Sequence, residues 1–394
     1  MEKSDKKKAS RRPGIAEREK LLVWGAAAGR CTFCNRLVTE NEDLGETVPI
    51  GELAHNVGWG EGSPRGDSEL PANARSHADN LLLLCRNCHK PADDSGVIGR
   101  FGVEELTRLK REHEQRIRLV TEIGGDRQAV VVRVVGNIRQ VSPELTFDTV
   151  LTAATQSGLF PVLIPGAYRH EAEVDLRRLP SEGTEAYFQT CAAQIDELAS
   201  RINAGIRRDE IPRLAVFGFA RIPILTHLGS RLDDKVPTVI FQRQRVDDSN
   251  AWKWPRPKPS TPNFVFETIH EHLEYSSVAL VINLSGVIPL DDLPDEILES
   301  SRVYALHPEN ESDVGPNVIG SPEALKAFEN AVRQLLAHLE GRHAQLERLP
   351  VFMAVPLSCA IVLGRVLMPN VSPLLEIHDR DDKGRFFKAL EVRR

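Results

Sequence analysis

Short apolar runs alternate with longer amphipathic stretches along the last two-thirds of the chain. The runs predict strands at 130–137, 214–220, 238–245, 277–286 and 302–308. The stretch SPEALKAFENAVRQLLAHLEGR, residues 321–342, has the spacing of an amphipathic helix. This alternation predicts α/β layers with largely parallel sheets.

A Gly-containing, charged stretch, EIGGDRQA at 122–129, precedes these runs. We expect a linker there, followed by an α/β domain over 130–394. An ordinary Rossmann-like enzyme would share this pattern. However, the chain has neither G-x-G-x-x-G nor G-x-x-x-x-G-K-S, so the usual dinucleotide and nucleoside triphosphate sites lack support.

The α/β region contains an internal repeat with a constant offset of 135 residues. Eight residues recur in register: Leu214/Leu349, Val216/Val351, Phe217/Phe352, Leu228/Leu363, Gly229/Gly364, Leu232/Leu367, Val236/Val371 and Arg245/Arg380. We infer two related strand–turn–helix–strand halves that face each other. Ligands of such sheets bind beyond the carboxyl ends of the strands, where helix N-termini offer N–H groups to anions. A pair of such turns suits a ligand with several phosphates, such as a cyclic oligonucleotide.

Three residues near these turns are candidate ligand contacts. Arg221 would add positive charge, Ser358 a hydroxyl donor, and Trp254 a ring for stacking on a base. Each has a simpler interpretation: a solvated arginine, a helix-capping serine and a tryptophan packed on its own domain.

The N-terminal third has a different pattern, with four leucines followed at once by possible metal ligands, LLLLCRNCHK at 81–90. Cys85 and Cys88 form one C-x-x-C pair, and Cys31 and Cys34 form another upstream. Two such pairs supply four thiolates, the number that a closed structural zinc site requires. Unliganded reduced cysteines are the alternative. We therefore expect a Zn²⁺ that stabilises a small domain with little apolar core.

Composition indicates the class of protein and its compartment. The chain has 394 residues, a net charge of −6 and only six cysteines, so a disulfide scaffold is not expected. Cys191 and Cys359 read as small core residues. No apolar run is long enough to cross a bilayer and no signal peptide is recognisable, so we expect a cytoplasmic protein without a membrane partner. The basic segment 1–14 reads as a solvated tail, or as an arm that touches phosphates.

Three polar residues interleave with the cysteines in the order His55, Asn80, His89. With GELAHN at 51–56 and NLLLLCRNCHKPADD at 80–94, this order resembles the HNH, or ββα-metal, endonucleases. The resemblance implies an α+β, zinc-stapled HNH domain over 15–121. It also implies a strand that carries His55, a helix that opens at NLLLLC with Asn80 at its N-cap, and a following helix at VEELTRLKREHEQR.

The resemblance also implies roles in the hydrolysis of DNA. His55 is the general base, Asn80 orients it, and His89 ligates a catalytic Mg²⁺ or similar divalent cation. A histidine near the zinc without catalytic role is the alternative for His89.

The sequence departs from the family at Ala54, where an acidic or histidine metal ligand is common. Strand alternation places Glu52 on the same face as Ala54, so Glu52 or His77 is expected to supply the missing ligand. Asp93, four residues after His89, is a further candidate near the metal.

Residues 130–394 resemble the SAVED domain, a fused pair of CARF-like, Rossmann-like halves. The resemblance lies in VFGFARIPILTHLG, ALVINLSG and FMAVPLSCAIVLGR. SAVED domains sense cyclic oligonucleotides in bacterial anti-phage signalling, and an HNH nuclease fused to SAVED is a known effector architecture there. The resemblance implies activation by a cyclic di- or trinucleotide, of the cyclic GMP-AMP class, with homo-oligomerisation and cleavage of double-stranded DNA.

Two other functions stay open. One is a ligand-responsive DNA-binding regulator with weak or no catalysis, which the missing acidic residue at Ala54 would favour. The other is a modification-dependent restriction endonuclease, which would cleave modified DNA without a second messenger.

Overall fold

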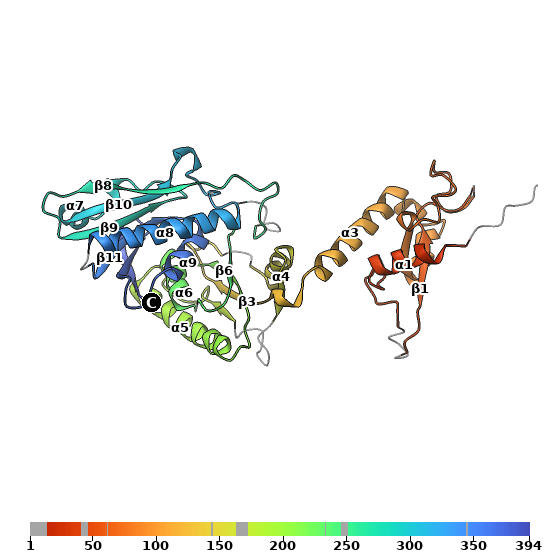
Figure 1. Cartoon of the computed structure of the whole chain (residues 1–394), viewed down its shortest axis with the longest axis horizontal. Helices are drawn as coiled ribbons and strands as arrows, with labels where there is room; N and C mark the ends of the chain where they lie inside the picture. Colours follow the sequence, from red (N-terminus) through yellow and green to blue (C-terminus); the bar gives the residue numbers. More distant parts are fainter. Residues whose placement is uncertain are drawn as a thin grey trace, which may run out of the picture. The chain divides into compact units, whose positions relative to one another are not determined.

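A computed structural model of the chain describes residues 14–40, 46–60, 62–142, 145–162, 172–232, 234–245, 251–343 and 346–394. The chain forms two compact units, Met1–Ile123 and Gly124–Arg394 (Figure 1). The division falls inside the expected linker. The expected basic tail lies outside the described residues, apart from Gly14.

Over its described residues, the first unit is a two-stranded antiparallel hairpin with three α-helices. Its elements are α1 (Glu17–Ala26), β1 (Gly51–His55), β2 (Leu81–Cys85), α2 (Arg86–Asp93) and α3 (Val103–Thr121). In the hairpin Gly51 pairs with Cys85 and His55 with Leu81. The leucines of β2 pack with Val23 of α1 and Leu106 of α3 in one small core.

The expectation of a helix opening at Asn80 is wrong. Residues 81–85 form the strand β2, and α2 begins only at Arg86. Every residue of β2 is buried, because helices or loops cover both faces of the hairpin there. A short, wholly apolar run of this kind is typical of a strand buried on both faces. Asn80 ends a short 3₁₀ turn, Ala78–Asn80, and is not a helix N-cap.

The second unit contains two sheets with helices, as the α/β pattern predicts. The first sheet comprises β3 (Gln128–Val135), β4 (Phe160–Val162), β5 (Glu173–Asp175), β6 (Leu214–Phe219) and β7 (Thr238–Phe241). Its strand order is β4-β3-β6-β7, β5 also pairs with β3, and all these pairs are parallel.

The second sheet comprises β8 (Phe264–Glu271), β9 (Ser277–Asn283), β10 (Ser301–Pro308), β11 (Arg348–Ala354), β12 (Leu374–Arg380) and β13 (Phe386–Val392). Its order is β13-β12-β11-β9-β10-β8, and only the edge strands β8 and β13 are antiparallel to their neighbours. The helices of this unit are α4 (Phe147–Gln156), α5 (Glu185–Arg207), α6 (Ile222–Arg231), α7 (Asp295–Ser300), α8 (Pro322–Arg342) and α9 (Leu357–Arg365).

The internal repeat corresponds to two halves with the same topology. The offset of 135 residues places α5, β6, α6 and β7 on α8, β11, α9 and β12. The strand order β4-β3-β6-β7 of the first half then matches β10-β9-β11-β12 of the second. The equivalence thus extends further towards the N-terminal side of each half than the recurring residues indicated.

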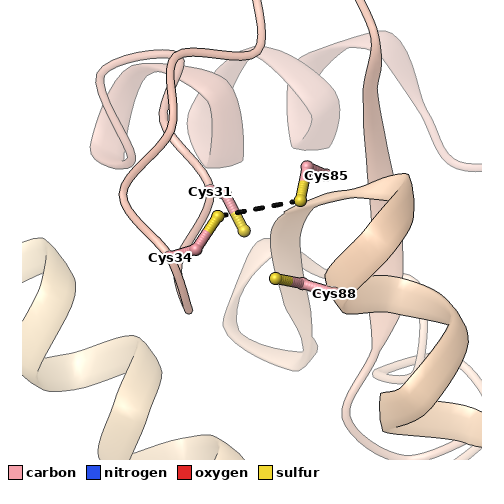
Figure 2. Close-up of side chains that lie close together, drawn as sticks. All are labelled: Cys31, Cys34, Cys85 and Cys88. Atoms are coloured by element: carbon pink, nitrogen blue, oxygen red, sulfur yellow. Dashed lines mark hydrogen bonds between the residues drawn. The ribbon is translucent and has the colours of Figure 1, made fainter.

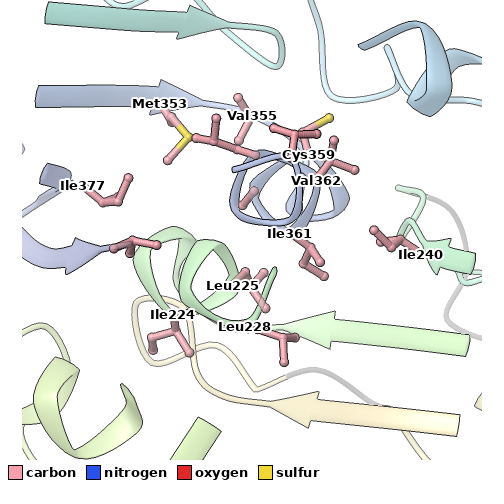
Figure 3. Close-up of a cluster of buried hydrophobic side chains, with 14 of the residues drawn as sticks. Ile224, Leu225, Leu228, Ile240, Met353, Val355, Cys359, Ile361, Val362 and Ile377 are labelled. Carbon is pink, nitrogen blue, oxygen red and sulfur yellow. The ribbon is translucent and has the colours of Figure 1, made fainter. Parts of the chain in front are cut away.

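The two halves meet where α6 crosses α9. Figure 3 shows Leu225 and Leu228 of α6 in one apolar cluster with Ile361 and Val362 of α9, and all four are buried.

A glycine from each half makes this crossing possible. A Cβ on Gly229 would overlap the carbonyl oxygen of Ile361, and a Cβ on Gly364 would overlap the carbonyl oxygen of Thr226. Thr226 and Ile361 are themselves equivalent under the offset of 135. The contact is therefore two-fold symmetric, and the recurring Leu-Gly pair marks the point where the two helix backbones touch.

Within the described ranges, every helix is either too short or too polar to cross a lipid bilayer.

We predict that Gly229→Ala or Gly364→Ala lowers the free energy of unfolding of the second unit by at least about 2 kcal/mol, because the methyl group forces the helices apart. Denaturant unfolding of the full chain measures this. Gly341 of α8 is the matched control, because a Cβ there meets nothing within 4 Å. Gly341→Ala should leave stability unchanged or slightly raised, since alanine is the better helix former. Equal stability of the wild type and both crossing variants would contradict the close approach.

Candidate functional site

Four thiols of the first unit converge on one point. Cys31 and Cys34 lie on the turn after α1, Cys85 ends β2, and Cys88 lies in the first turn of α2 (Figure 2). Their sulfur atoms all lie within 4.8 Å of one another, and Cys34 Sγ is 3.7 Å from Cys85 Sγ. In the described residues no other set of three or more possible metal ligands is as close. Four sulfurs at such distances fit a tetrahedral Zn²⁺.

The electrostatics of this cluster favour a bound cation. Burial raises the pKa of Cys31 and of Cys88, and the neighbouring thiols raise that of Cys88 further. Burial also acts on Cys34, but hydrogen bonds from the main chain at Arg36 and from the other thiols outweigh it and lower its pKa. Ionisation of Cys31 and Cys88, whose pKa values are raised, is therefore favoured by a compensating positive charge such as a bound metal ion.

His55 and Asn80 lie close together at the end of the hairpin. His55 is buried at the end of β1. The Asn80 side chain hydrogen-bonds to the main chain of two residues. Its Oδ1 accepts from Val57 N (2.9 Å), and its Nδ2 donates to Val57 O (2.9 Å) and Arg75 O (2.8 Å). Asn80 therefore fixes the backbone just after His55.

Two buried arginines, neither of which the sequence analysis identified, hold the loop between β1 and β2. Arg75 donates to the carbonyl oxygens of Gly58, Gly66, Ser68 and Leu70. In the sequence, the only indication of a structural role for the two arginines was their position in a polar loop with few apolar residues.

The second arginine, Arg65, joins the end of β1 to the end of α2. It donates to the carbonyl oxygens of His55 (3.1 Å) and Asn56 (2.6 Å), and also to Ala92 O (2.8 Å) and Asp93 Oδ1 (2.6 Å).

His89 lies between two carboxylates. Its Nδ1 is 2.7 Å from Glu52 Oε2, and its Nε2 is 3.4 Å from Asp93 Oδ2. Two carboxylates and an imidazole are donors of the right kind for a divalent cation. The structure thus brings Glu52 and Asp93 to His89. His77 is exposed and does not line the hollow around these residues.

On β1, Glu52 and His55 occupy alternate faces, because side chains alternate along a strand.

A hollow of about 540 Å³ lies between the two halves of the second unit. Both turns of the repeat line it, and most of its lining falls into equivalent pairs. These are Phe219/Ala354, Ala220/Val355, Arg221/Pro356, Ile222/Leu357, Arg243/His378 and Arg245/Arg380. The hollow lies beyond the carboxyl ends of the central strands, where such sheets bind ligands.

The chemistry of the hollow is less symmetric than its shape. The first half contributes Arg139, Arg221, Arg243 and Arg245, whereas the second contributes Arg380 and Asp379. Arg380 is itself paired with Asp292 at 2.7 Å. Positive charge is therefore concentrated on the side of the first half.

Arg221 joins the two halves at the floor of this hollow. Its Nε donates to Asp379 Oδ2 (2.8 Å), its Nη2 to Arg380 O (2.8 Å), and its Nη1 lies 3.3 Å from Glu182 Oε1. Burial opposes its charge, but Asp379 and Glu182 outweigh burial and raise its pKa. Arg221 is in the expected place, yet its charge is already compensated by two carboxylates.

Ser358 takes part in a second contact between the two halves. Its backbone N (3.1 Å) and its Oγ (2.7 Å) both donate to Gln242 Oε1, so a side chain of the first half caps helix α9 of the second. Ser358 is fully buried. Trp254 packs against the main apolar core and is not among the residues that line the hollow. Neither residue is placed to touch a ligand without rearrangement.

A known protein family matches most of the second unit. A family model described as SAVED, the SMODS-associated and fused to various effectors sensor domain, matches residues 194–392. The chain belongs to the SAVED family. Its SAVED domain is a sensor domain with two CARF-like halves, and the hollow lies between the halves.

Among solved structures, the chain has distant similarity to SAVED/CARF-domain containing receptors. The Cap4 receptor of Acinetobacter baumannii with the cyclic trinucleotide 3'3'3'-cAAA is 13% identical, with a TM-score of 0.45 over 74% of this chain and 62% of that one. The same receptor with 2'3'3'-cAAA is 14% identical, with a TM-score of 0.44 over 74% and 61%. The Cap4 receptor of Moraxella osloensis is 15% identical, with a TM-score of 0.39 over 83% and 71%. This SAVED chain thus spans about three-fifths of the A. baumannii receptor, and no curated protein matches it.

We predict that Cys85→Ser reduces the zinc content of the purified protein from about one ion per chain and destabilises the first unit, because a tetrahedral site loses one of four ligands. Elemental analysis and thermal unfolding measure the two effects. Cys191→Ser, which removes a thiol far along the chain in the other unit, should leave the zinc content unchanged. Full zinc content in the Cys85 variant would show that the cluster has another purpose.

Proposed function

We propose that this SAVED protein is a cyclic-oligonucleotide-activated DNA endonuclease of an anti-phage defence system. The observation that carries the proposal is the ββα arrangement of the first unit. It places His55 at the end of β1 and His89 at the start of α2, next to a four-thiol cluster. A sensor family that is fused to various effectors supplies the context for such a unit.

The ligand follows from the chemistry of the hollow. Exposed Arg139 and Arg245, together with Arg243, offer positive charge for phosphates. The comparison receptors from A. baumannii were solved with cyclic trinucleotides. A cyclic di- or trinucleotide, including the cyclic GMP-AMP class, is the ligand that we propose.

The first unit would perform the hydrolysis. His55 takes a proton from the attacking water, because a neutral imidazole is a competent base near neutral pH. Asn80 and Arg65 hold the backbone at and just after His55 in place. His89 and one of the two carboxylates beside it, Glu52 or Asp93, would hold a Mg²⁺-like ion, since the two carboxylates face opposite nitrogens of the ring. Such an ion would stabilise the charge that develops on the phosphate. The four cysteines would hold a structural Zn²⁺.

A DNA-binding regulator is the second candidate. One observation favours it: in the described residues the Glu52–His89–Asp93 cluster does not have the close spacing of the cysteine cluster. Binding of DNA without cleavage, in every metal and ligand condition, would support this alternative.

We expect His55→Ala to abolish cleavage of plasmid DNA in the presence of Mg²⁺ and an activating cyclic nucleotide, because no other base is proposed for the water. Zinc content and ligand affinity should be unchanged. Gel assays of supercoiled plasmid, with a panel of cyclic di- and trinucleotides, give the rate. Wild-type cleavage by this variant would remove His55 from the mechanism, and cleavage by the wild type without ligand would refute gating.

We expect Arg245→Ala to raise the ligand concentration needed for half-maximal activation by about tenfold, since a charge-assisted hydrogen bond to phosphate is lost. Direct calorimetric binding to the full chain should show the same change. Arg333, an exposed arginine of α8 that pairs with Glu329, is the control, and Arg333→Ala should change neither quantity. An unchanged activation curve for Arg245→Ala would place the phosphates elsewhere.

A further inference from the structure

A shallow hollow on the first unit brings two basic side chains beside the His89 cluster. Besides Glu52, His89 and Asp93, it is lined by Arg86, Lys90 and Asp94. Arg86 lies four residues before Lys90 on α2, so the two are neighbours on one helix face, with Cβ atoms about 5–6 Å apart. The pair therefore stands directly next to the cluster that includes His89.

The acidic residues of this hollow are already engaged with other groups. Glu52 contacts His89, and Asp93 contacts both His89 and Arg65. Asp94 Oδ1 accepts a hydrogen bond from Gly96 N. In the part of the chain that the structure describes, neither Arg86 nor Lys90 forms an ion pair, and both are exposed. Two uncompensated cations thus remain at the rim of a cluster that contains two carboxylates.

We infer that Arg86 and Lys90 hold backbone phosphates of a DNA duplex next to the phosphodiester that faces His89. The inference rests on the nuclease proposal and adds the residues that position its substrate. A guanidinium can hold a phosphate with two parallel hydrogen bonds, and an ammonium acts as a point charge. Without such cations, the carboxylates of the cluster would repel the substrate.

Contacts to phosphate fix the register of a protein on DNA and carry no sequence information. Arg86 and Lys90 therefore contribute affinity and position, and the choice of sequence lies with other residues. The binding energy from these contacts depends on salt, because each neutralised phosphate releases counterions.

The test measures the affinity of the full-length protein for a DNA duplex of about 20 base pairs. Fluorescence anisotropy gives this affinity in NaCl from about 50 to 200 mM, without divalent metal. Arg86→Gln and Lys90→Gln should each weaken binding about five- to tenfold near 0.1 M salt and reduce the slope of log K against log salt by about 0.9. Arg86→Lys should keep the wild-type slope, because the charge is kept.

Arg108 of α3 is the matched control, since it is an exposed arginine that Glu105 and Glu112 already neutralise. Arg108→Gln should change neither affinity nor slope. Wild-type slopes in the Arg86 and Lys90 variants would overturn the inference, as would tighter binding to a duplex RNA of the same sequence. A protein that binds DNA through these residues but never cleaves it would refute the nuclease and leave the contact standing.

Discussion

The close approach of α6 and α9 is the constraint on which the sensor domain depends. Each helix presents a glycine to a carbonyl oxygen of the other, at equivalent positions of the repeat. Any side chain at either glycine would separate the helices. Because α6 and α9 follow directly from the central strands β6 and β11, their distance also sets the distance between the two turns that line the hollow. A packing contact in the core thus determines the width of the ligand site.

Two contacts between the halves lie just above this crossing. Arg221 of the first half reaches Asp379 of the second, and Gln242 of the first half reaches Ser358 of the second. One contact is ionic and the other is neutral, and they do not join equivalent residues, since the offset of 135 places Arg221 on Pro356 and Asp379 on Gln244. The halves have kept the same architecture while their chemistry has diverged, and this divergence gives the hollow one strongly basic side.

Much of the fold could be predicted from the amino-acid sequence alone. The parallel α/β pattern and the helix at 321–342 each have a clear period, and the structure confirms them. The strand that carries His55 was expected from the resemblance to HNH endonucleases, and the structure confirms it as well. Gly229 and Gly364 were visible as a recurring pair because the same steric need acts twice. The same resemblance led to the wrong expectation of a helix at the four leucines, and the sequence could not correct it because a strand buried on both faces shows no alternation.

The partners of single polar residues could not be predicted in the same way. Arg221 and Ser358 were expected to contact a ligand, but nothing local to either residue indicates Asp379 or Gln242, which lie more than a hundred residues away. Arg65 and Arg75 were missed for the same reason, since their partners are main-chain oxygens that every residue carries.

The bonds of Arg65 and Arg75 to main-chain oxygens bear on which side chains the first unit can tolerate. Arg75 grips the loop between β1 and β2 through carbonyl oxygens of four residues, and Arg65 does the same at the end of β1. A carbonyl oxygen is present whatever the side chain, so these hydrogen bonds place no demand on the side chains of the gripped residues. Only Gly58 and Gly66 are restricted, because a Cβ at either position would overlap neighbouring atoms of the loop. Two guanidinium groups can therefore keep the shape of a loop whose other side chains are set by different requirements.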